Sequence, residues 1–145
     1  MSAIIEELRY AMRRRLIATG VVVISEFQAE GKDAPEGVDF YIRETITPLD
    51  VTEETQNSNL HQFLIDYDIF ADRKVFSAIT SKVYGAAETI RNEFTMSRDK
   101  HLIALPELPN CTAYLERLVQ YGSASLEDEL YRLPVQIYVN VQECL

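Results

Sequence analysis

The stretch from Phe40 to Phe70, FYIRETITPLDVTEETQNSNLHQFLIDYDIF, decides the fold because it holds two runs of strand character around a polar middle. Apolar and polar residues alternate in 39–48 and again in 60–70, which is typical of strands with one buried face. Pro48 is expected to end the first strand, which leaves residues 49–59 as a long polar loop. The stretch therefore predicts an antiparallel hairpin with a long connection.

Side chains two residues apart on a strand point to the same face. One face of the second strand is therefore expected to be buried, and it consists of Phe63, Ile65, Tyr67 and Ile69. Asp66 and Asp68 fall on the other face, where their carboxylates could share a divalent ion. The simpler interpretation is that the two aspartates form the solvent side of the strand.

Two helices are predicted around this hairpin. Ser2 can cap a first helix, which Gly20 would end, and its apolar positions have helical spacing: Ile5, Leu8, Met12 and Leu16. DRKVFSAITSKVYGAAETIRNEF, residues 72–94, is the clearest helix in the chain. Its apolar stripe recurs close to every fourth residue: Val75, Ile79, Val83, Ala86 or Ala87, Ile90 and Phe94.

The remaining segments complete an α+β domain. VVVISEF, KHLIALPELPN and the alternating LYRLPVQIYVNVQ are predicted as strands, TAYLERLVQYG fits either a helix or a strand, and SASLEDE is predicted as a polar loop. Pro134 indicates an edge strand or the start of a strand. The prediction is a single domain, residues 1–145, with a mostly antiparallel sheet, an N-terminal helix and one long central helix packed on one face.

Charge is unevenly distributed along the chain. The net charge of −9 disfavours general affinity for nucleic acid. Four arginines lie in the first helix, whereas residues 26–54 are strongly acidic. Such patches could join copies of the protein head to tail, and the candidate interface residues are Arg9, Arg13, Arg14, Arg15, Glu44 and Asp50. The alternative is that both regions are solvated faces.

The sequence contains no recognisable catalytic or metal-binding motif, and no cofactor is predicted. Cys111 and Cys144 match no zinc spacing and favour a reduced cytoplasmic setting, and His61 and His101 have no ligand at a known spacing. Phosphate-loop and serine-elbow motifs are missing. The apolar run after the arginines is too short for a membrane span and is not typical of a signal peptide. A structural or assembly role is therefore favoured.

The order of these segments resembles the tail terminator and tail-completion proteins of long-tailed bacteriophages, the group that includes lambda-type minor tail protein U. The likeness rests on SAIIEELRYAMRRRLI, then FYIRETITP, then HQFLIDYDIFADR leading into KVFSAITSKVYGAAETIRNEF, and finally LYRLPVQIYVNV. It covers nearly the whole chain, and residues 96–129 match least well.

The resemblance implies a structural virion protein without enzymatic activity or cofactor. It implies a homo-oligomeric ring, usually of six copies, at the head-proximal end of the tail, assembled in the host cytoplasm. The ring would cap the tail tube protein and present a joining surface to the head–tail connector protein. The loop expected to meet a partner comprises Val51, Thr52, Glu53, Glu54, Thr55, Gln56, Asn57 and Ser58.

Three alternatives stay open on the sequence. A tail-completion or head–tail adaptor protein would share the fold. A small acidic host binding module would remain monomeric alone. An enzyme could use Asp66, Asp68 and Glu88 with a divalent metal, and a specific metal would then stabilise the native state.

Overall fold

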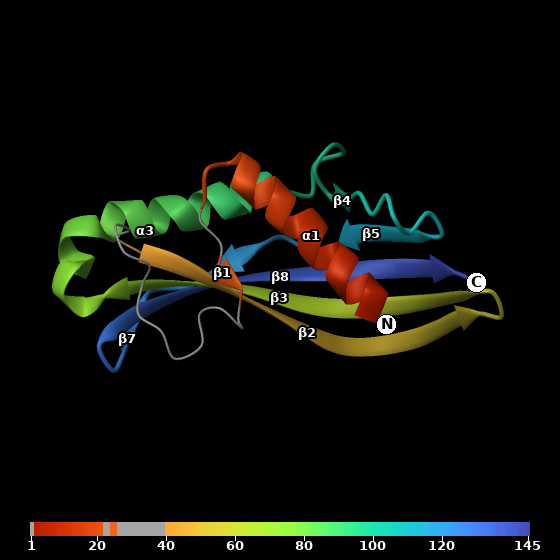
Figure 1. Ribbon diagram of the computed structural model, residues 1–145, viewed down its shortest axis with the longest axis horizontal. Helices are drawn as coiled ribbons and strands as arrows, with labels where there is room; N and C mark the ends of the chain where they lie inside the picture. The colour runs from red at the N-terminus through yellow and green to blue at the C-terminus, as the bar shows by residue number, and fades with distance from the viewer. Residues whose placement is uncertain (1, 22–23, 26–39) are drawn as a thin grey trace.

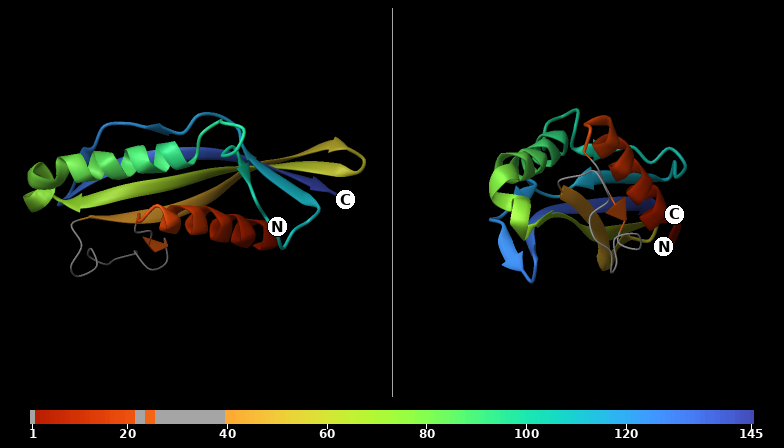
Figure 2. Two further views of the ribbon diagram at one scale, coloured as in Figure 1. Left: turned by 90° about the horizontal axis from the view of Figure 1, so that it is seen from above. Right: turned by 60° about the vertical axis from the view of Figure 1, so that its left-hand side comes forward.

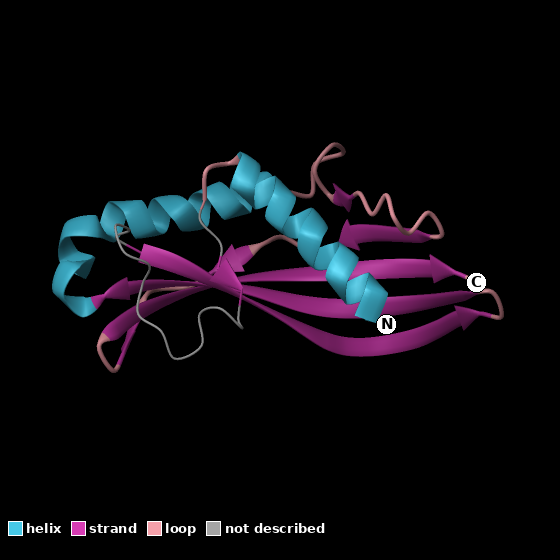
Figure 3. Cartoon of the chain, viewed as in Figure 1, coloured by secondary structure: helices cyan, strands magenta, loops and turns pink. Residues whose placement is uncertain are grey.

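The computed structural model describes residues 2–21, 24–25 and 40–145, and Figure 1 shows their arrangement. Within these residues one sheet of eight strands is covered by two helices on the same face, which confirms the predicted α+β class (Figures 1 and 3). The elements in chain order are α1 Ser2–Ala18, β1 Ile24–Ser25, β2 Phe40–Thr55, β3 Ser58–Asp72, α3 Arg73–Glu93, β4 Leu102–Ile103, β5 Cys111–Leu115, β6 Gln120–Tyr121, β7 Ser125–Glu127 and β8 Leu130–Cys144.

Two long strands form the centre of the sheet. The order is β1-β2-β3-β8-β5-β4, and β6 and β7 also pair with β8. β3 lies antiparallel to both neighbours along nearly its whole length, pairing with β2 from Ser58 to Ala71 and with β8 from Ser58 to Asp72. The only parallel pairing among the described strands is that of β1 with β2. Because β3 has a partner on both sides, it is the scaffold on which the other elements are placed.

The core lies between the sheet and the two helices, whose positions beside the sheet are shown in Figure 2. β3 and β8 contribute the alternate residues that the sequence predicts, and Phe63, Ile65, Tyr67 and Ile69 are all buried. Both helical stripes are confirmed with two exceptions. Val75 is exposed because it precedes a kink at Ile79, where the backbone is not helical. In α1, Ile4 is fully buried and Ile5 only partly.

The prediction that Pro48 ends its strand is wrong, and so is the long loop over 49–59. β2 continues to Thr55, and only Gln56 and Asn57 separate it from β3. Pro48 lies at an irregularity in the register, between its own pairing with Phe63 and that of Asp50 with Gln62. Among the described strands, none pairs with the outer edge of β2 beyond Glu44. A proline is tolerated at such a position because the edge needs no ladder hydrogen bond.

The second half of the chain also differs from the predictions. Residues 111–115 form a strand that buries Ala113 and Leu115, which settles the ambiguous segment. Residues 125–127, predicted as loop, form β7 and pair with the start of β8. Pro134 lies within a central strand rather than at an edge or a strand's start. It is tolerated there because it falls between the stretches of β8 that pair with β6 and β7.

The first predicted strand, VVVISEF, is described only at Ile24 and Ser25, and the acidic residues 26–39 lie outside the described part of the chain. Neither described helix is long and apolar enough to cross a membrane.

Candidate functional site

A buried carboxylate joins α1 to the sheet. Glu44 lies on the core face of β2 and is only 1% exposed. Its Oε1 accepts a hydrogen bond from Arg13 Nε at 3.0 Å and lies 3.3 Å from Arg9 Nε. The hydroxyl of Tyr67, on β3, donates to Oε2 at 2.9 Å. One carboxylate therefore has partners from α1 and from the neighbouring strand.

Burial dominates the electrostatics of this cluster. It raises the pKa of Glu44 above its usual value, while Arg13, Tyr67 and Arg9 act in the opposite direction. Burial and the adjacent Glu44 raise the pKa of Tyr67 well above its usual value, so the phenol stays a hydrogen-bond donor. A buried charge is tolerated when its hydrogen-bonding capacity is satisfied, as it is here. The arrangement holds α1 in place and offers no free nucleophile.

A third arginine of α1 contacts the end of α3. Arg15 Nε donates to Glu93 Oε1 at 3.0 Å, and Nη2 donates to the Glu93 carbonyl at 2.7 Å. Its guanidinium also lies 4.5 Å from the centre of the Phe94 ring. The last carbonyls of a helix have no partner within the helix, and a cation there is favourable. Arg15 therefore ties the two helices together.

These contacts bear on the predicted subunit interface. Arg9, Arg13, Arg15 and Glu44 bond within their own chain, so the predicted basic and acidic regions meet inside one subunit. The other two candidates, Arg14 and Asp50, have exposed side chains. That any of the six joins copies of the protein stays a prediction.

The predicted partner-contact loop is the end of the β2–β3 hairpin. Val51 and Thr52 belong to β2 and are exposed, as are Gln56 and Asn57 in the turn. Glu53, Glu54 and Thr55 complete β2, and Ser58 is buried and begins β3 opposite Cys144. In Figure 2 the turn lies at one end of the molecule, beyond both helices. Its role in partner contact stays a prediction.

Sequence reasoning missed a polar pair beneath this hairpin end. His61 is buried, and its Nε2 lies 2.9 Å from Glu143 Oε1 on β8. The two residues are far apart in the sequence, so periodicity carries no signal of the contact. Among the described residues, His61 and Glu143 belong to no group of three or more side chains that could hold a metal ion.

The aspartates of β3 are not equivalent. Asp68, predicted on the solvent side, is buried and paired with Arg132 of β8 at 3.1 Å. Asp66 is half-buried, and burial and the nearby Asp68 raise its pKa. Glu88 lies on α3, which covers the opposite face of the sheet, so the three carboxylates considered for a metal are not brought together. No cluster that could hold a metal ion is found among the described residues.

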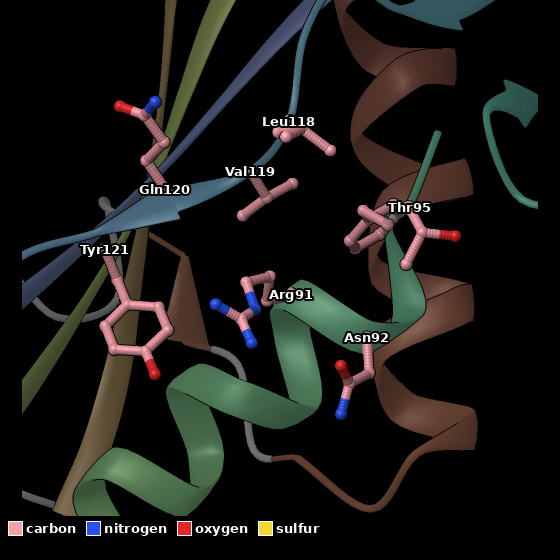
Figure 4. A pocket seen from close by; sticks show the side chains of 8 residues that line it. Arg91, Asn92, Thr95, Leu118, Val119, Gln120 and Tyr121 are labelled. Atoms are coloured by element: carbon pink, nitrogen blue, oxygen red, sulfur yellow. The ribbon is translucent and has the colours of Figure 1, made fainter. Parts of the chain in front are cut away.

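A groove of about 690 Å³ opens between the end of α3 and the chain around β6. Its lining comes from two segments: Arg91, Asn92, Phe94 and Thr95, then Leu118, Val119, Gln120 and Tyr121 (Figure 4). The Tyr121 hydroxyl donates to Glu88, which also pairs with Arg91 at 3.0 Å. Sequence reasoning missed the groove, because the two segments are brought together only by the sheet.

Comparison with known proteins supports the fold alone. No family model matches the chain, and no curated protein matches it. Solved structures do match. One of them, whose name states no function, covers 94% of this chain and 94% of its own, with a TM-score of 0.61 and 14% sequence identity. Likeness at this level of identity indicates a shared fold and carries no function with it.

Proposed function

We propose that the protein is a structural virion protein of a long-tailed bacteriophage, a ring-forming tail terminator. It caps the tail tube, stops its elongation and provides the joining surface for the head-side connector. It acts at the head-proximal end of the tail as a homo-oligomer, without enzymatic activity, cofactor or membrane. The proposal combines the resemblance of the sequence with one structural observation.

That observation is the hairpin of β2 and β3. The strands have 16 and 15 residues and form a long arm whose turn lies beyond the helices at one end of the molecule (Figure 2). Beyond Glu44 the outer edge of this arm has no partner among the described strands, and Leu49 and Val51 on it are about half exposed. An exposed strand edge is a surface on which another chain can pair. Such an arm fits an assembly protein better than a protein with an enclosed substrate site.

A tail-completion or head–tail adaptor protein of the same fold is the second candidate. The β2–β3 arm favours this candidate as well, because an adaptor could use the same arm to contact its neighbours in a ring at the connector. The two differ in their partner: a terminator binds tube ends, whereas an adaptor binds the connector and leaves tube growth unchanged.

The test is to assemble tubes from the tail tube protein encoded in the same genome, with and without this protein, and to measure their lengths by negative-stain electron microscopy. Tubes that stop growing and carry a ring at one end are the expected result. Tubes of unchanged length and bare ends would contradict the terminator role. Binding to the purified connector in that case would favour the adaptor.

A further inference from the structure

The groove beside α3 combines exposed apolar side chains with a buried apolar floor. Leu118 is 65% exposed at its rim, and Met96, which directly follows the lining residue Thr95, is 43% exposed. Val119 and Phe94 are buried and form the floor. Apolar side chains that remain at the rim of a hollow are typical of a surface that binds another protein.

Cations face outward around this groove. The Arg91 side chain is 51% exposed, and that of its partner Glu88 is 41% exposed. Arg117, which is next to Leu118, is 53% exposed, and its partner Glu116 is 28% exposed. Lys100, whose Nζ donates to the Asn92 carbonyl at 3.3 Å, is 47% exposed against 22% for Glu93. In each pair the cation is the more accessible member. The charges that this rim exposes most are therefore cations, although each has an acid as its partner, in a protein whose net charge is −9.

The hairpin has the opposite character. Its sequence has no lysine or arginine between Arg43 and Arg73, while the outer half of β2 contains Asp50, Glu53 and Glu54. Asp50 is exposed and lies between Leu49 and Val51, whose side chains are 49% and 47% exposed. Neighbouring side chains of a strand point to opposite faces, so Val51 and Asp50 lie on opposite sides of this edge, and a groove with two walls can contact both.

We propose that the outer half of β2 in one copy docks into the α3 groove of a second copy, with Leu49 and Val51 against Leu118 and Met96, and Asp50 near Arg91. Groove and hairpin are different patches, so the contact is head to tail and leaves one groove and one hairpin free at the ends of a chain of copies. The inference rests on the proposed function only for the closure of such a chain into a ring.

A charge swap tests the contact. Asp50→Arg and Arg91→Asp are made singly and together, and self-association is measured by sedimentation velocity over a concentration series. Each single variant is expected to weaken association by at least about tenfold, because like charges then face each other, and the double variant is expected to regain most of the loss. Lys74→Glu, an exposed charge change in the first turn of the same helix, serves as the control and should leave association unchanged.

Circular dichroism melting curves establish that each variant is folded. Single variants that associate as tightly as the wild type would overturn the inference, and so would a wild-type protein that stays monomeric at the highest soluble concentration. The tube assay keeps the two proposals apart. If wild type and Arg91→Asp cap tubes alike, the terminator role stands and the groove contact is wrong; if capping fails while the charge swap works, the reverse holds.

Discussion

Glu44 illustrates how one buried side chain can organise a fold. It occupies a core position on β2 between Ile42 and Ile46, where an apolar residue would be the simpler choice. Its carboxylate is satisfied by two arginines of α1 and by Tyr67. Apolar packing alone leaves a helix some freedom to slide, whereas a directional contact defines its place. We interpret the cluster as the contact that sets the position of α1 on the sheet.

The cluster predicts a graded loss of stability. Glu44→Gln removes the buried carboxylate charge that faces Arg9 and Arg13 and is expected to lower the free energy of unfolding by about 3 kcal/mol. Tyr67→Phe removes one donor to a buried oxygen and is expected to cost about 1–2 kcal/mol. Both are measured by urea denaturation followed by circular dichroism. Glu6→Gln, an exposed acid on α1, is the matched control, and a loss of similar size there would contradict the prediction.

Replacing Asp66 is expected to stabilise the protein to an extent that depends on pH. Burial and the charge of Asp68 raise the pKa of Asp66 from 3.8, so its ionised form is disfavoured in the folded state. Stability is then lost as the pH rises through the folded-state pKa, and the loss is absent below 3.8, where the group is protonated in both states. Asp66→Asn should therefore stabilise the protein at pH 7 by up to about 1 kcal/mol and have no such effect at pH 3.

The measurement is urea denaturation at both pH values, with Asp99→Asn, an exposed aspartate, as the control. An equal gain at pH 3 and pH 7 would show that the effect comes from the amide and not from the removed charge.

The start of α3 depends on its cap. The Asp72 side chain accepts a hydrogen bond from the Lys74 backbone N–H at 2.8 Å, and its own backbone is extended. Asp72→Ala is expected to cost about 1 kcal/mol, whereas Asp72→Ser, which keeps an acceptor, should cost little. Thermal unfolding of the two variants makes the comparison. Equal losses would mean that Asp72 acts other than as a cap.

The β2–β3 hairpin is the element in which the sequence pattern was most misleading. Most of residues 49–59 are polar, and Pro48 precedes them, a composition that predicts a loop. In the structure β3 and β8 pair from end to end, and β2 follows its neighbour along the same length. A strand with solvent on its outer edge needs neither apolar residues nor a complete ladder, which is why its composition resembles that of a loop.

The pairing of the strands predicts which backbone amides are protected from hydrogen exchange. β3 has partners on both sides along its length, so its amides between Phe63 and Ile69 should exchange most slowly, through global unfolding. In the monomer, at dilute concentration, the outer half of β2 pairs with β3 alone, and its outward amides should exchange faster by orders of magnitude. Hydrogen exchange followed by mass spectrometry or NMR measures this. Equal protection in both segments would indicate that another chain covers the β2 edge.

Periodicity in the sequence was enough to identify the α+β class, both helices, and the buried faces of β3 and β8. These features depend on contacts that repeat along one element, and hydrophobic spacing records them directly. Only the tertiary structure decided that residues 49–55 are strand, that Asp68 is buried, that His61 pairs with Glu143, and that Glu44 holds α1 through two of its arginines. Each of these depends on a partner distant in the chain, which no local pattern contains. The groove beside α3 arises in the same way, because its two walls meet only when the sheet brings them together.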